Sequence, residues 1–337
     1  MRLGFGLITC QRYPGDARAF EEIYQEALEL ASFAEELGFD SVWVSEHHFV
    51  DDGYLPSLLP LCAAIAARTS GVEIGTGLLL APLHEPLRLA EDAAVVDLLS
   101  GGRLILGMGV GWREEEFEAL GVPMSERGAR MERTIELLRG AWSGELVDMP
   151  GGAGVAVTPT PARSSGPPIW IGGFAERAIR RAGRLADGFM ATEVTPDELA
   201  QQVAWARDER ERAGRDPADL AISLHVPTFP WNGPDAWERV APYARYISWK
   251  YDDMEGAKGR TGPPLPAPPP SLQEEATLRD STLLGTPEEV AERIRGFEEA
   301  SGGGLHFVAR LYYPGMDPAL QREVLQLFAE EVAPLVR

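Results

Sequence analysis

The sequence predicts a single (β/α)8 barrel, a TIM barrel of the α/β class, over residues 1–337, and three observations favour this fold. Eight apolar runs of strand length alternate with amphipathic stretches of helix length. With 337 residues, 45% of them hydrophobic, the chain suits either two domains or one large barrel. An open doubly wound sheet would need a glycine-rich loop after its first strand, and the segment Thr9-Cys10-Gln11-Arg12 contains no glycine.

The expected strands are short apolar runs bounded by polar residues or by glycine. In chain order they are residues 3–8, 41–45, 72–80, 104–109, 169–172, 188–192, 222–227 and 306–311. Among the helices, residues 20–37 place apolar side chains three to four positions apart, and Gly38 supplies the stop. Residues 85–99 follow the same pattern, with Pro86 at the start of the helix.

Two segments interrupt the alternation of strands and helices. Residues 144–168, after the fourth helix, contain Pro150-Gly151-Gly152 and predict a hairpin or an extended excursion. Residues 254–281, before the eighth strand, contain six prolines between positions 263 and 270, so we expect no regular structure in this insertion. A solvated linker and a lid over the barrel mouth both fit this composition.

Composition argues against several classes of partner. The net charge of −21 would repel nucleic acid and anionic membranes. Cys10 and Cys62 lack the spacing of metal ligands and are expected to be free thiols, which is typical of the reducing cytoplasm. No apolar run approaches the roughly 18 residues of a membrane span, and the N-terminus enters a strand without a signal peptide.

Three titratable residues, Glu46, His47 and His48, follow the second expected strand without a spacer. In a parallel barrel the loop after each strand opens on the catalytic face, so these side chains are candidates for catalysis. A neutral imidazole can transfer protons near pH 7. Histidines and carboxylates do not recur at several strand ends, so we expect no metal site.

Several motifs occur in order, each in the strand context that it requires. They are residues 46–49 (Glu-His-His-Phe), 75–78 (Gly-Thr-Gly-Leu), 82–92, 98–107, 168–173 and 186–188. Together they resemble the bacterial luciferase-like monooxygenases, densely up to residue 192 and more thinly beyond. The resemblance implies a barrel that binds reduced flavin mononucleotide (FMN), or its 5-deazaflavin relative coenzyme F-420, across the C-terminal mouth.

The resemblance also implies roles for the residues after the second strand. His47 matches the family's histidine that manages a proton, so it is the expected general base. Glu46 would orient the His47 imidazole or raise its basicity, and His48 would be a neighbouring partner or contact the flavin ring. His84 and His306 are interpreted as structural.

For the flavin ring, the expected contacts lie on the third and fourth strands. A non-proline cis peptide bond is expected between Gly77 and Leu78, as in related barrels. For the phosphate, the turn at Gly173 leads into a helix whose first amides are free to bind an anion. Val110 stands where the family often has an arginine, so the phosphate is expected to depend on two other arginines. The expected cofactor-binding residues are Thr76, Gly77, Leu78, Gly109, Arg127, Gly173, Phe174 and Arg177.

The substrate site is expected to be apolar and aromatic, because its candidate residues follow strands or lie in loops on the predicted C-terminal face. Phe174 and Tyr312 are further aromatic candidates of this kind. The expected substrate-contacting residues are Tyr54, Trp112, His225 and Trp231.

These features favour a flavin-dependent monooxygenase that uses reduced flavin and dioxygen on a small apolar organic substrate. A coenzyme F-420-dependent hydride-transfer oxidoreductase is the alternative, and a non-catalytic flavin-binding protein, which should lack the histidine pair, is the third. No nicotinamide site is recognisable, so a separate flavin reductase is the expected partner. The helix at residues 58–68 has almost no polar face, and related enzymes pair through this region, so a homodimer is expected.

Overall fold

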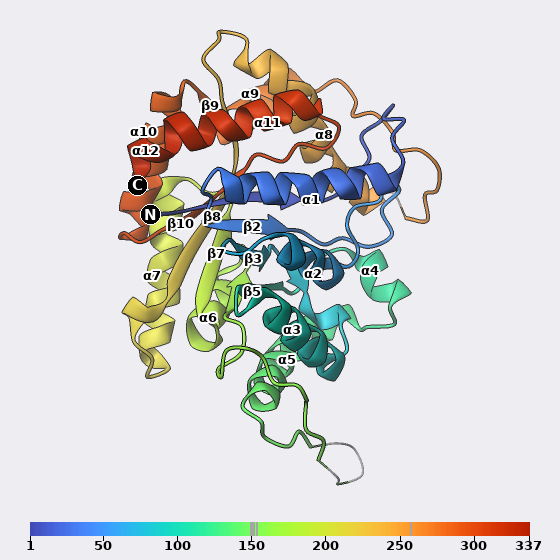
Figure 1. The fold of residues 1–337 in the computed structure, drawn as a ribbon, viewed down its shortest axis with the longest axis vertical. Coiled ribbons are helices and arrows are strands. Elements are labelled where there is room, and N and C mark those ends of the chain that lie inside the picture. The colour runs from blue at the N-terminus through green and yellow to red at the C-terminus, as the bar shows by residue number, and fades with distance from the viewer. Residues whose placement is uncertain (149–151, 153, 257) are drawn as a thin grey trace.

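The computed structural model describes residues 1–148, 152, 154–256 and 258–337, and its centre is a closed barrel of eight parallel strands (Figure 1). The strand order is β10-β1-β2-β3-β5-β6-β7-β8, and β10 pairs with β8 to close the barrel. Two short strands, β4 and β9, extend the pairing of β5 and β8. The strands are β1 (Arg2–Ile8), β2 (Ser41–Val44), β3 (Glu73–Thr76), β4 (Leu79–Leu80), β5 (Leu104–Gly109), β6 (Ile169–Gly172), β7 (Gly188–Thr192), β8 (Ala221–Pro230), β9 (Leu283–Gly285) and β10 (His306–Arg310).

Helices surround the barrel, as the alternating pattern predicts (Figure 1). The long ones are α1 (Phe20–Glu36), α2 (Leu58–Arg68), α3 (Pro86–Ser100), α5 (Arg127–Trp142), α6 (Glu176–Leu185), α7 (Pro196–Arg212), α8 (Ala236–Gly256), α9 (Leu272–Ser281), α10 (Pro287–Ser301) and α11 (Pro318–Leu327). The short ones are η1 (Ala81–Leu83), α4 (Glu114–Ala119), η2 (Met124–Glu126), η3 (Pro217–Asp219), the π-helical turn η4 (Phe328–Val332) and α12 (Ala333–Val336).

The predicted TIM-barrel fold is confirmed, and two of its strands differ from the prediction. The third strand, expected over residues 72–80, is interrupted after Thr76, and the chain resumes as β4 further along β5. The predicted cis peptide bond between Gly77 and Leu78 is present at this interruption. Strand β8 runs to Pro230, beyond the predicted end at 227, because β9 pairs with its last three residues.

Two layers of apolar side chains form the core. The barrel interior is filled by Leu7, Trp43, Ile105, Trp170, Met190 and Val308. A larger cluster fills the space between the strands and the surrounding helices. Helix α2 buries six residues against its neighbours, whereas Ala63 and Ala64 stay partly exposed.

The two insertions differ from each other in structure. In the first, a single antiparallel bridge joins Val147 and Val155 and no strand forms in the described part, which fits the predicted hairpin or excursion, while residues 149–151 and 153 lie outside the described residues. In the second, the prediction of no regular structure over 254–281 is wrong at both ends. Helix α8 continues to Gly256, and α9 begins after Ser271, whose side chain accepts from the Glu274 amide in a capping box. The prolines prevent a helix only in the segment between α8 and α9.

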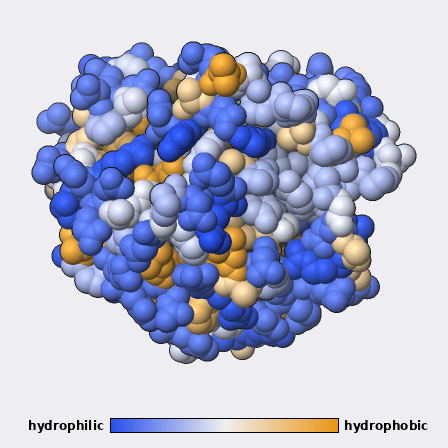
Figure 2. All heavy atoms as spheres, turned by 90° about the horizontal axis from the view of Figure 1, so that it is seen from above, coloured by the Kyte–Doolittle hydropathy of each residue, from blue (hydrophilic) through white to orange (hydrophobic). Residues whose placement is uncertain are grey.

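Strands β1 and β2 run from left to right in Figure 1, so their C-terminal ends lie on the side of α4 and of the start of α1. Figure 2 keeps this left–right direction and shows an indentation on the right-hand side of a mostly hydrophilic surface.

Candidate active site

His47 lies at the barrel mouth, three residues after the end of β2, with only 6% of its side chain exposed. Three aromatic rings surround its imidazole edge-on. The ring centroids of Tyr54, Trp112 and Tyr251 lie 4.8, 5.7 and 5.7 Å from that of His47. The hydroxyl of Tyr54 donates to Ser45 Oγ at 3.0 Å and pairs with the Tyr251 hydroxyl at 3.1 Å. Sequence reasoning predicted Tyr54 and Trp112 as substrate-contacting residues on the C-terminal face, and it missed Tyr251, which comes from α8.

A buried carboxylate, Glu116 on α4, holds His47. Glu116 Oε1 lies 2.9 Å from His47 Nδ1 and accepts a hydrogen bond of 2.8 Å from the backbone amide of His48. Its second oxygen, Oε2, is buried and has no hydrogen-bond partner in the described part of the chain. The sequence offered only a weak signal for this residue, because Glu116 is the third of three consecutive glutamates and is 69 positions away from His47.

Glu46 has a different role from the predicted one. Its carboxylate pairs with His48 Nε2 at 2.6 Å and with His84 Nε2 at 3.1 Å, and it accepts from the Leu80 amide at 3.1 Å. The prediction that Glu46 orients His47 is therefore wrong, because Glu116 occupies that position. His84, interpreted as structural, lies in the same group as Glu46 and His48.

The electrostatics of Glu46 and His48 follow from this pairing. Burial raises the pKa of Glu46, but the hydrogen bonds from His48 and His84 outweigh it and lower that pKa to about 2. Burial lowers the pKa of His48, yet the Glu46 carboxylate more than compensates, so the pKa of His48 is raised. Glu46 and His48 therefore form a charge-assisted hydrogen bond near the mouth, in which Glu46 is fully buried and His48 is half-buried.

The predicted ring-binding residues come together on one side of the mouth. A Cβ atom added to Gly109 would lie 3.0 Å from Leu78 Cδ1, and one added to Gly172 would lie 2.6 Å from the same atom. Leu78 therefore packs directly against the backbone of two strand glycines, and its side chain is half-buried. Thr76 is turned away from this surface, because its hydroxyl donates to the Gly107 carbonyl at 2.7 Å.

The predicted phosphate-binding residues lie on the first turns of α5 and α6. Arg127 donates to the Met124 carbonyl at 3.0 Å, and Arg177 is exposed on α6. The two helices lie beside each other, since Arg181 donates to Glu132 at 2.9 Å. No side chain among the described residues caps the start of α6, which leaves its first amides available to an anion.

Comparison with known proteins decides the family. The family model for luciferase-like monooxygenases matches residues 1–303. The chain belongs to the luciferase-like monooxygenase family. Its curated relatives include oxidoreductases of two kinds.

One relative of this luciferase-like protein is the 4-hydroxyprotoasukamycin monooxygenase of Streptomyces nodosus subsp. asukaensis, 27% identical, with 99% of this chain and 92% of the relative covered. Another is the F420-dependent glucose-6-phosphate dehydrogenase of Nakamurella multipartita, 31% identical, with 93% and 92% covered. The monooxygenase RslO1 of Streptomyces bottropensis has the same fold, with a TM-score of 0.84 at 24% identity over 99% of both chains. So does the oxygenating constituent of 3,6-diketocamphane monooxygenase from Pseudomonas putida, solved with FMN, with a TM-score of 0.80 at 22% identity over 100% and 99%.

Helix α8 covers the His47 side of the mouth of this luciferase-like barrel. Lys250 is fully buried and pairs with Asp51, in the loop after β2, and with Asp253 at 3.0 Å. The Arg113 guanidinium donates to the carbonyls of Met254, at 3.0 Å, and of His48. These contacts join α8 and the start of the proline-rich insertion to the loops that carry His47 and Glu116.

Two predicted substrate residues lie apart from the His47 group. His225 is buried inside the barrel, with its ring 5.1 Å from that of Trp43 and its Cε1 close to Gly77. Trp231 stacks on Phe229, with ring centroids 6.0 Å apart, and its indole donates to Asp235 at 3.0 Å. Trp231 directly follows the end of β8, which β9 extends to Pro230, and its expected contact with the substrate stays a prediction.

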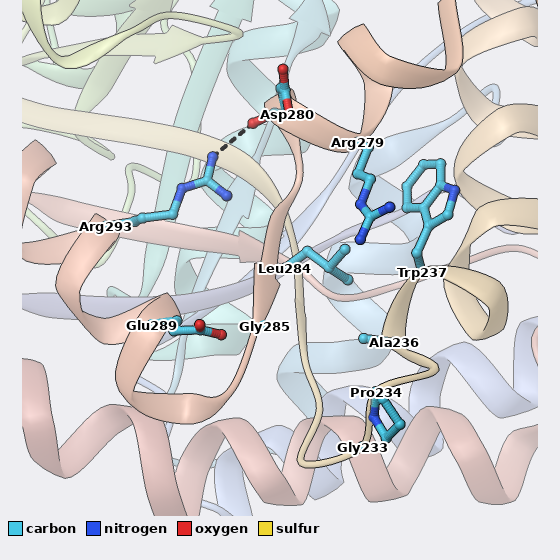
Figure 3. A pocket seen from close by; sticks show the side chains of 10 residues that line it. All are labelled: Gly233, Pro234, Ala236, Trp237, Arg279, Asp280, Leu284, Gly285, Glu289 and Arg293. Atoms are coloured by element: carbon cyan, nitrogen blue, oxygen red, sulfur yellow. Dashed lines mark hydrogen bonds between the residues drawn. The ribbon is translucent and has the colours of Figure 1, made fainter. Parts of the chain in front are cut away.

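A surface cavity of about 520 Å³ lies on this side as well, between α8, α9, β9 and α10 (Figure 3). Its lining includes Trp237, Arg279 and Arg293, and Arg293 donates to the Asp280 carbonyl at 2.7 Å. None of the residues that surround His47 lines it, so this cavity is separate from the His47 group.

Two structural findings bear on other site classes. Within the ranges that the structure describes, no group of three or more histidine, cysteine, aspartate or glutamate side chains could hold a metal ion. None of the described helices is long and apolar enough to cross a membrane.

Proposed function

We propose that the protein is a flavin-dependent monooxygenase that uses reduced FMN and dioxygen on a small apolar organic substrate. The observation that carries this proposal is the buried His47, held by Glu116 and enclosed by three aromatic rings at the barrel mouth. A site of this kind can handle one proton while its apolar walls keep water away from the reacting atoms.

The residues near the mouth fit FMN. Leu78, lying on Gly109 and Gly172, would support the flavin ring. The uncapped start of α6, with the amides after Gly173 and the side chains of Arg127 and Arg177, would hold the phosphate. When bound, reduced FMN supplies the electrons that reduce dioxygen.

His47 would act as the proton-transfer group. A carboxylate can only accept, so the pairing with Glu116 favours the tautomer in which Nδ1 carries the hydrogen and Nε2 is free to take a proton. Glu116 would stabilise the imidazolium that forms, in the way that a buried carboxylate supports a catalytic histidine. Tyr54, Trp112 and Tyr251 would contact the substrate and exclude water.

A second candidate function is hydride transfer with coenzyme F-420. The 31% identity to an F420-dependent glucose-6-phosphate dehydrogenase over 93% of the chain favours it. The same histidine would then exchange a proton with the substrate during hydride transfer. Under this alternative dioxygen has no part, whereas under the monooxygenase proposal a separate flavin reductase would supply the reduced FMN.

The test is the substitution His47→Ala, with Phe49→Ala as a control on an exposed aromatic residue of the same loop. We expect His47→Ala to bind FMN as tightly as the parent and to change the rate at which bound reduced FMN is reoxidised by dioxygen by about a hundredfold, as loss of a general base typically does. Unchanged reoxidation with retained FMN would contradict the proposal.

A further inference from the structure

Arg310, the last residue of β10, points into the barrel at its mouth. Side chains alternate along a strand, so residues 306, 308 and 310 face the same side. His306 faces inward, with its ring 5.7 Å from that of Trp43, and Val308 belongs to the interior cluster. Arg310 is the next inward position, at the C-terminal end of the row.

The guanidinium of Arg310 has no close partner. Its side chain is only 12% exposed, and the nearest carboxylate, Glu193, lies 4.0 Å away and is itself 61% exposed. In the described part of the chain the guanidinium makes no hydrogen bond, whereas the similarly buried Arg113 donates to two carbonyls and to Glu115. This largely buried guanidinium therefore keeps its donors free for a ligand that enters the barrel mouth.

A second unpartnered group lies one layer below Arg310. In the pairing of β8 with β10, His225 stands opposite Val308 and Pro227 stands opposite Arg310. His225 Nε2 is buried and has no hydrogen-bond partner among the described residues. The ring is only 3% exposed, so a polar atom of a ligand is the natural partner for this nitrogen as well.

The charge of Arg310 acts across the mouth. Burial lowers the pKa of His225 well below its usual value, and Arg310 lowers it further, so this imidazole is neutral. Burial raises the pKa of Tyr54, and Arg310 opposes that rise. The positive charge therefore acts on groups from β8 and from the loop after β2, on opposite sides of β1.

We propose that Arg310, with His225 beneath it, is an anion-recognition site that binds a negatively charged oxygen of the ligand at the barrel mouth. The inference rests on the proposed function, because it requires the cofactor and substrate to meet there. Two sources offer such an oxygen: the pyrimidine edge of reduced flavin, which carries negative charge in its anionic form, and a carboxylate or enolate on an otherwise apolar substrate. Both suit a planar guanidinium with several donors.

The experiment compares the parent with Arg310→Gln and Arg310→Lys, and uses Arg322→Gln as a control, since Arg322 is a surface arginine that pairs with Glu29. Affinities for oxidised and photoreduced FMN are measured by titration, and the midpoint potential of bound FMN by dye equilibration. Benzoate and benzamide, an anion and its neutral analogue, are then titrated into the FMN-loaded proteins. For a parent that binds only coenzyme F-420, the two redox forms of that cofactor replace FMN.

If the flavin is the source, Arg310→Gln weakens reduced FMN about ten- to a hundredfold relative to oxidised FMN. This change corresponds to a midpoint potential lower by about 30–60 mV for a two-electron couple. If the substrate is the source, the same substitution weakens benzoate about ten- to a hundredfold and leaves benzamide unchanged. Arg310→Lys, which keeps the charge, should lose less in either case, and it carries the comparison if Arg310→Gln does not fold.

Equal affinities of the parent and the Arg310 variants for both FMN forms, together with no Arg310-dependent binding of benzoate, would overturn the inference. In that outcome the proposed function stands, because the parent still binds FMN. A parent that binds neither FMN nor coenzyme F-420 would instead refute the proposed function and this inference with it.

Discussion

Replacing Glu116 by glutamine is the closest test of the geometry around His47. Glutamine keeps the shape of the side chain and one acceptor oxygen, but it removes the negative charge that faces His47 Nδ1 at 2.9 Å. A hydrogen bond to a charged group contributes about 1.5–3 kcal/mol, and a neutral one about 0.5–1.5 kcal/mol. The difference, about 1–1.5 kcal/mol, is a factor of close to ten in the step that protonates His47. We therefore expect Glu116→Gln to slow that step about tenfold.

The assay is the stopped-flow reoxidation of protein-bound reduced FMN by dioxygen, preceded by an FMN titration that verifies loading. Glu118→Gln is the matched control, because Glu118 lies on the same helix, is 53% exposed and pairs only with Lys258 among the described residues. Glu116→Ala should cost more than Glu116→Gln, since it leaves two buried donors without an acceptor. Reoxidation at the parent rate in both Glu116 variants, with FMN bound, would refute the role given to this carboxylate.

Three further predictions follow from the site and the surface. Arg177→Ala should weaken FMN binding about ten- to a hundredfold in a fluorescence titration, and an unchanged dissociation constant would mean that the phosphate lies elsewhere. In the folded protein the pKa of Glu46 is lowered and that of His48 is raised. The pair therefore stabilises the fold fully between the unfolded-state pKa values of the two groups, 4.5 and 6.5. This stabilisation is lost as the pH falls toward 2, where Glu46 is protonated, or rises through the raised pKa of His48. Glu46→Gln should therefore lower the Tm most in that window, and an equal loss of Tm at alkaline pH, where His48 has lost its proton, would contradict the pairing. Light scattering should give a homodimer that Ala64→Glu, on the partly exposed face of α2, converts to monomers, and a monomeric parent would rule out the dimer. Cofactor should slow proteolysis within residues 254–281, and unchanged cleavage would rule out the lid.

The sequence predicts the barrel well because its strands are buried on both faces and therefore appear as continuous apolar runs. It also predicts the group at Leu78 and Gly109, because small residues on adjacent strands are where a flat ligand can approach the backbone. The extra strand β9 escapes prediction, since three residues carry too little periodic signal. The helix α9 was missed because the prolines before it dominate the composition of the insertion, although Ser271 and Glu274 form a recognisable capping box.

The site could be predicted only where its residues are neighbours in sequence. Glu46, His47 and His48 are adjacent, so their importance is visible, but which carboxylate serves which histidine depends on tertiary packing. Glu116 and Tyr251 reach His47 from α4 and α8, and nothing in the local sequence distinguishes them from other acidic or aromatic residues. Arg310 is similar, since its inward direction emerges only from the register of β10 with β1 and β8.

The most direct test of the proposed function is a parallel titration of the purified protein with FMN and with coenzyme F-420, in oxidised and reduced forms, followed by exposure of each reduced complex to dioxygen. The proposal predicts that reduced FMN binds and that its reoxidation by dioxygen depends on His47. Binding of coenzyme F-420 alone, with no His47-dependent reaction of reduced FMN, would contradict it and favour the hydride-transfer alternative.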